Sequence, residues 1–128
     1  MIVLLDTSTP VCKVSFVDSD WRVDDQWEAG RTLAKGLLGY LQASLKENGK
    51  TWADISGIVA FKGPGSFTGL RIGLTVLNTF ADSEKVSIVG TTGDRWQKDG
   101  LERLARGDND KLVMPEYGVE VHITAPRK

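Results

Sequence analysis

The segment from Leu70 to Ala81 constrains the fold most, because it carries apolar side chains on nearly every face. Arg71 is its one charged residue, and the next charge, Asp82, follows its end. A helix that is apolar nearly all round has to be covered on several sides. The sequence therefore predicts that other elements of the chain or a partner cover this helix on several sides.

Hydrophobic periodicity predicts three strands before the first helix, and then an alternation of strands and helices. The predicted strands span residues 1–7, 12–17, 21–27, 55–62 and 86–89, and the predicted helices span 29–48, 68–81 and 94–106, before an extended tail over 111–124. This order is typical of one ribonuclease-H-like half of an actin-like (ASKHA) protein. We expect an α/β fold with a mixed sheet, with residues 1–92 as the lobe and residues 93–128 as a short helix and extended C-terminal tail.

Composition fits one domain without disulfides. The chain has 128 residues, of which 41% are hydrophobic and 26% charged, enough for a single core. Cys12 is the single cysteine, which suits the reducing cytoplasm. The apolar start ends at Asp6 and is too short for a signal peptide or membrane span. The formal net charge of −1 gives no general attraction to phosphate backbones.

The loop of residues 63–69, Gly-Pro-Gly-Ser-Phe-Thr-Gly, does not match the known phosphate or nucleophile motifs. A P-loop requires Gly where Thr68 stands, and the dinucleotide pattern requires its third Gly one residue before Gly69. A hydrolase elbow around Ser66 would need glycines in place of Pro64 and Thr68. Two interpretations remain: a strand-to-helix turn that caps the helix, or a turn whose free amides receive an anion.

Candidate catalytic groups are few. Asp6 ends the first predicted strand, where related kinases and ATPases place a carboxylate that directs magnesium, and the alternative is a carboxylate that caps the next turn. His122 is the single histidine, so metal clusters built on histidine are not expected. Cys12 shares an apolar strand face and is expected in the core. We predict no catalytic residue, metal or cofactor, with Asp6, Gly63, Gly65 and Ser66 as weak candidates for nucleotide binding.

Two helices carry a pattern that suits either internal packing or a partner. Leucines recur every four residues along 29–48, and Gly69 and Gly73 leave one face of the second helix without side chains. We expect close approach of another helix there. The predicted interface residues are Leu33, Leu37, Leu41, Leu45, Gly69, Leu70, Gly73, Leu74 and Leu77.

Residues 2–10 and, above all, the eleven residues from Gly63 to Gly73 resemble the TsaB family, also called YeaZ. Residues 89–92 are similar to the family's next strand, so the resemblance covers residues 1 to about 92. It implies a role in making N6-threonylcarbamoyladenosine (t6A) at position 37 of tRNA. In that system TsaB is a catalytically inactive relative of the transferase TsaD, which it binds through the two helices that match 29–48 and 68–81.

The resemblance also implies that a TsaE-like ATPase joins the assembly. From the leucine stripe we expect a homodimer when TsaD is missing. From the absence of a basic patch and of a long apolar segment we expect only indirect contact with tRNA and none with a membrane. Family members carry a second lobe, for which residues 93–128 are too few, and one lobe cannot enclose a nucleotide. Phe80 replaces smaller family residues and is expected to adapt the interface. The favoured hypothesis is a non-catalytic scaffold. The alternatives are a nucleotide-binding enzyme that uses Asp6 and the 63–69 loop, and a homodimeric interaction protein unrelated to tRNA.

Overall fold

The computed structural model describes residues 1–116 and confirms the predicted α/β class and order of elements. The strands are β1 (Ile2–Asp6), β2 (Val11–Asp18), β3 (Trp21–Glu28), β4 (Gly57–Phe61) and β5 (Ser87–Thr91). The helices are α1 (Leu33–Glu47), α2 (Phe67–Glu84) and α3 (Trp96–Ala105), with short 3-10 turns at Gly30–Thr32 and Trp52–Asp54. The predicted tail beyond residue 116, His122 included, lies outside the described residues.

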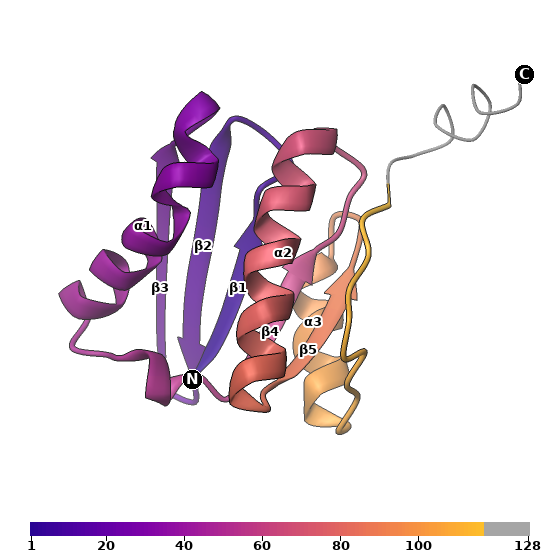
Figure 1. Ribbon diagram of the computed structural model, residues 1–128. Helices are drawn as coiled ribbons and strands as arrows, with labels where there is room; N and C mark the ends of the chain where they lie inside the picture. Colours follow the sequence, from indigo (N-terminus) through magenta and orange to yellow (C-terminus); the bar gives the residue numbers. More distant parts are fainter. Residues whose placement is uncertain (117–128) are drawn as a thin grey trace, which may run out of the picture.

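The five strands form one mixed sheet in the order β3-β2-β1-β4-β5. β1 pairs antiparallel with β2, and β2 with β3, through tight connections. β4 lies parallel to β1 and to β5, and parallel neighbours need crossover connections, which α1 and α2 supply. Figure 1 shows α1 and α2 side by side on one face of the sheet and α3 on the other.

The core has two layers because side chains alternate along β1. Val3 and Leu5 face α1 and α2 and belong to the larger cluster, which includes Phe16 and Ile58. Leu4 faces the other way and packs with two valines of β4 and β5 beneath α3. Burial on both faces explains why the first strand is a continuous apolar run, as expected for a strand covered on two sides.

The outer edge of β5 is closed by the segment after α3. The N–H of Ile88 donates to Asn109 Oδ1 (3.1 Å), and the C=O of Ile88 accepts from the N–H of Asp110 (2.8 Å). The N–H of Gly90 donates to Asp110 Oδ2 (2.9 Å), and its C=O accepts from the Arg103 guanidinium (3.3 Å). The backbone groups of an edge strand otherwise remain open to pairing with another chain.

Arg103 holds this edge closure in place. Its guanidinium bonds Asp108 (3.1 Å) and Asp110 (3.0 Å). The bond to Asp110 lowers the pKa of that carboxyl, and the pKa of Asp108 is lowered by its bonds to Arg106 and, second, to Arg103. A lowered pKa in the folded state stabilises the fold at and above the ordinary Asp pKa of 3.8, and this contribution disappears as the pH falls through the folded value. The hydrogen bonds of Arg103 with the ionised Asp108 and Asp110 are therefore present at neutral pH.

Replacing Arg103 with Leu should open the β5 edge. We expect the amide of Gly90 to lose about tenfold or more of its hydrogen-exchange protection, because its partner, the Asp110 carboxylate, is held by the guanidinium. The free energy of unfolding should fall by about 1–3 kcal/mol. Arg106→Ala is the matched control, because Arg106 also bonds Asp108 but its side chain is 65% exposed. Equal exchange in both variants would show that Arg103 does not hold the edge.

Candidate functional site

The 63–69 loop lies where the parallel strands end, between β4 and α2. This edge is where ligands bind in many open α/β sheets. Ser66 is the N-cap of α2, and its Oγ accepts from the N–H of Gly69 (3.3 Å). The capping role predicted for this loop is therefore confirmed, with Ser66 as the capping residue.

The glycines of the loop and helix make room for the residues that follow β1. An added Cβ would lie 2.4 Å from Ser8 Cβ at Gly65, 2.2 Å from the Thr7 carbonyl oxygen at Gly69, and 2.2 Å from Thr7 Oγ1 at Gly73. Each distance is far inside van der Waals contact. The close approach predicted at Gly69 and Gly73 exists, but Thr7 of the same chain makes it, and not another helix.

Hydrogen bonds lock the same contact. The N–H of Ser66 donates to the carbonyl oxygen of Ser8 (2.8 Å), and the buried Thr7 hydroxyl donates to the carbonyl oxygen of Gly69 (2.7 Å). Two hydrogen bonds thus fix the start of α2 to the residues that follow β1, one donated by α2's N-cap and one donated by Thr7. The N–H groups of Ser66 and Gly69 already have partners within the chain.

Asp6 caps the turn that follows β1. Its Oδ1 accepts from both the N–H (2.8 Å) and the hydroxyl (2.6 Å) of Ser8. This geometry matches the turn-capping interpretation of the carboxylate. Within residues 1–116, no group of three or more His, Cys, Asp and Glu side chains is placed to hold a metal ion.

Gly63 is covered by the tail. Its φ of +123° favours glycine, and an added Cβ would lie 2.1 Å from the carbonyl oxygen of Glu116. The N–H of Glu116 donates to the carbonyl oxygen of Lys62 (2.7 Å). The chain's own residues therefore pack against all four weak nucleotide candidates, Asp6, Gly63, Gly65 and Ser66, or bond to them.

Cys12 lies in the core, 1% exposed. Burial, together with the negative charges of Asp6 and Asp25, raises the pKa of its thiol to about 12. A nucleophilic cysteine needs the opposite shift, toward the thiolate. The expectation that Cys12 packs in the core is confirmed.

The leucines proposed as partner contacts lie inside the chain, which corrects that prediction. The apolar stripes of α1 and α2 both cover the sheet, so these side chains have no exposed surface to offer. None of the following is more than 5% exposed: Leu33, Leu37, Leu41, Leu45, Leu70, Leu74 and Leu77. Gly69 and Gly73 are buried against Thr7.

The outward sides of the two helices instead form an apolar groove, which the stripe pattern did not reveal. Two depressions that share Val76 make up this surface: Ala34 and Ile72 line the one between the helices, and Leu38 and Phe80 line the rim of one that reaches down to core side chains; we call them together the α1–α2 groove. The Leu38 side chain is 58% exposed. Phe80 packs against Trp52, with ring centroids 5.5 Å apart. Leu38 follows a stripe leucine directly in sequence, so a fifth leucine outside the four-residue repeat was the available signal.

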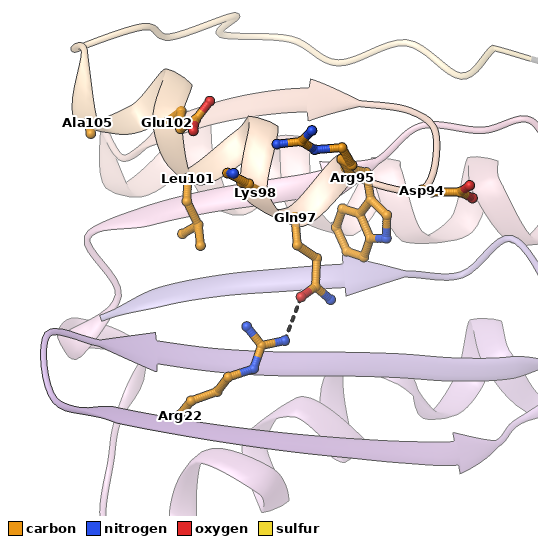
Figure 2. A pocket seen from close by; sticks show the side chains of 9 residues that line it. Arg22, Asp94, Arg95, Gln97, Lys98, Leu101, Glu102 and Ala105 are labelled. Carbon is orange, nitrogen blue, oxygen red and sulfur yellow. Dashed lines mark hydrogen bonds between the residues drawn. The ribbon is translucent and has the colours of Figure 1, made fainter.

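A second depression lies on the opposite face, between α3 and β3 (Figure 2). The Arg22 guanidinium donates to Gln97 Oε1 (2.5 Å), which ties β3 to α3. The hydrogen bond from the Ser15 hydroxyl and, second, the one from Arg22, which also pairs with Asp24, lower the pKa of the Asp24 carboxyl. Cations and carboxylates alternate along this depression, so it offers no uniform charge to a ligand.

The sheet order, the helices and the loop define one ribonuclease-H-like lobe of the actin-like class. The family described as "TsaD: tRNA N6-adenosine threonylcarbamoyltransferase" matches residues 27–92. The chain belongs to this family, as one of its TsaB (YeaZ) members. Within residues 1–116, no helix is long and apolar enough to cross a membrane.

The individual relatives that the chain resembles are named TsaB or YeaZ as well. The Escherichia coli (strain K12) "tRNA threonylcarbamoyladenosine biosynthesis protein TsaB" is 29% identical over 80% of this chain and 47% of its own length. The TsaB protein of Buchnera aphidicola subsp. Baizongia pistaciae (strain Bp) is 36% identical over 59% of this chain and 34% of its own. The solved structure of YeaZ from Pseudomonas aeruginosa has a TM-score of 0.67 at 25% identity and covers 77% of this chain and 49% of that one. The chain thus spans half or less of the length of these relatives.

Replacing Gly69 with Ala should destabilise the fold by about 2 kcal/mol or more, because the new methyl group would overlap the Thr7 backbone. Gly39→Ala on α1 is the matched control: an added Cβ there meets nothing within 4 Å, so this variant should gain about 1 kcal/mol of helix propensity. Urea unfolding of both variants measures the difference. Equal stability of Gly69→Ala and the unmodified chain would contradict the packing role of the loop.

Proposed function

We propose that this chain is a non-catalytic TsaB-like subunit in t6A biosynthesis, and that it binds a TsaD-like protein through the α1–α2 groove. The observation that carries the proposal is the pairing of a glycine loop packed by the chain's own residues with an apolar groove on the outside of the same helix. The loop packs against the interior of the chain, and the groove is the apolar surface that a partner can contact.

The groove has the properties of a protein-binding surface. Exposed apolar patches with polar borders mark interaction sites in soluble proteins. Here Leu38 lies more than half exposed on α1, and the partly buried Ile72, Val76 and Phe80 line the facing side of α2. Side chains that are partly pre-packed lose little rotamer freedom on binding, which favours affinity.

The geometry around the loop supports the non-catalytic part of the proposal. Asp6 is engaged by Ser8, the amides of Ser66 and Gly69 have internal partners, and Glu116 packs on Gly63. The alternative of a nucleotide-binding enzyme at Asp6 and this loop would require these contacts to open. The tightness of the Thr7 contact weighs against that alternative.

The remaining parts of the assembly follow from the family resemblance. We propose that a TsaE-like ATPase joins the complex, that the chain acts in the cytoplasm, and that tRNA is contacted through the partner. A second copy of the chain would occupy the groove when the TsaD-like protein is missing. The third hypothesis, a homodimer unrelated to tRNA, uses the same groove and differs in its partner.

Replacing Leu38 with Glu should weaken binding of the TsaD-like protein encoded in the same genome by about tenfold to a hundredfold, because it places a charge in an apolar contact. Calorimetric titration measures the dissociation constant, and circular dichroism checks the fold. Ala105→Glu on α3 is the control, because it adds the same charge to an exposed helical position on the other face. Unchanged affinity of the Leu38 variant would exclude the groove as the binding site.

A further inference from the structure

Along most of their length the outward sides of α1 and α2 carry cations, and the carboxylates of these helices, Glu47, Asp82 and Glu84, lie at their C-terminal ends. Residues 30–46 and 67–81 include Arg31, Lys35, Lys46 and Arg71 and no Asp or Glu. All four cations are exposed, although the whole chain has a formal net charge of −1. This distribution gives the part of the face around Lys35 and Arg71, in the first turns of the two helices, a positive potential of its own.

Arg71 stands at the centre of this face. Arg71 borders the groove on one side. On the other side, together with Thr75, it borders a depression between α2 and residues 112–115, which we call the α2–tail depression. Its guanidinium lies over the Phe67 ring, 5.3 Å from the centroid. Among the ion pairs between residues 1 and 116, none includes Arg71. Its charge is available to a carboxylate from another molecule.

Residues 112–115 of the tail form the far wall of the α2–tail depression. The Asn78 side chain donates to the carbonyl oxygen of Val113 and accepts from its N–H, both at 2.8 Å. Val113 is thereby held inward, 3% exposed. Its neighbours Leu112 and Met114 face outward, 59% and 65% exposed. Asn78 thus fixes two apolar side chains beside Arg71.

We propose that the partner covers this entire face with an acidic-rimmed apolar surface: carboxylates meet Arg71 and Lys35, and apolar side chains cover Leu112 and Met114 as well as the groove. This inference rests on the proposed function and specifies the chemistry of its partner. A second copy of this chain would bring its own Lys35 and Arg71 to this face, so it should bind there more weakly than an acidic partner and only when that partner is missing. The tail residues 112–115 therefore belong to the binding surface and determine which partner fits.

The apolar side chains favour a protein over RNA as the occupant. RNA phosphates would also be attracted to the cations. That attraction is electrostatic and weakens as the salt concentration rises, and exposed Leu and Met side chains add little to it. The large hydrophobic side chains exposed within residues 1–116 are Leu38, Phe67, Leu112 and Met114. Leu38 borders the groove, and the other three lie next to Arg71 or along the wall of the α2–tail depression.

The test measures the affinity for the TsaD-like protein of the same genome at about 50 and about 500 mM NaCl. We expect affinity to fall severalfold at the higher salt, and self-association of the chain, measured by analytical ultracentrifugation, to rise. Arg71→Glu should weaken the complex about tenfold or more, and Leu112→Ser with Met114→Ser should weaken it about tenfold at either salt. Arg95→Glu, an exposed cation on the α3 face, is the matched control.

Each outcome is informative. If the unmodified chain does not bind the TsaD-like protein, the proposed function fails. If it binds and Leu38→Glu disrupts binding, but Arg71→Glu and the double tail variant behave like Arg95→Glu, the proposed function stands and this inference is overturned. Binding of unmodified tRNA at low salt that is lost in Arg71→Glu, without an effect of the tail variant, would assign the face to RNA and overturn it as well.

Discussion

The carbonyl oxygen of Thr7 lies against the first turns of α2 with no space for a side chain between them, and the arrangement of the molecule depends on this contact. It fixes α2 across the ends of β1 and β4, because Gly65, Gly69 and Gly73 approach the backbone and side chains of Thr7 and Ser8. The position of α2 in turn determines where its outward side meets α1. Asn78 on the same helix then holds the tail at Val113.

A glycine-rich turn between a strand and a helix is commonly associated with phosphate binding, since it exposes amides at a helix N-terminus. Here the same features serve internal packing, because other residues of the chain occupy the place where a bound phosphate would lie. Glu116 lies on Gly63 and Ser8 lies on Gly65. A loop packed in this way contributes to stability and to the placement of α2, which makes the outer face of that helix the more favourable place for function.

The sequence predicted the order of strands and helices because each element has a clear apolar period. The leucine repeat identified α1, and the continuous apolar run identified β1. The repeat did not reveal which layer covers those leucines, because a stripe that faces a sheet and one that faces a partner have the same spacing. Leu37 and Leu74 were expected at an interface and lie in the core. Leu38, outside the repeat, lies on the surface.

The filling of the loop could not be predicted, because it depends on residues far apart in the sequence. Thr7 and Gly69 are 62 residues apart, and the pairing of β1 with β4 brings them together. The edge closure by Arg103 and Asp110 is a similar case: the sequence shows a run of charges, typical of a solvated face. In the structure the Asp110 and Arg103 side chains bond the backbone of Gly90, and the Asn109 side chain and the Asp110 N–H bond that of Ile88.

The central claim is that this chain serves t6A formation as a binding subunit. Mass spectrometry of nucleosides from total tRNA measures it most directly, in cells that lack the gene and in the same cells supplied with the unmodified gene. We expect t6A to fall strongly in the deletion and to return on complementation. Normal t6A in the deletion would contradict the account and favour an interaction protein unrelated to tRNA.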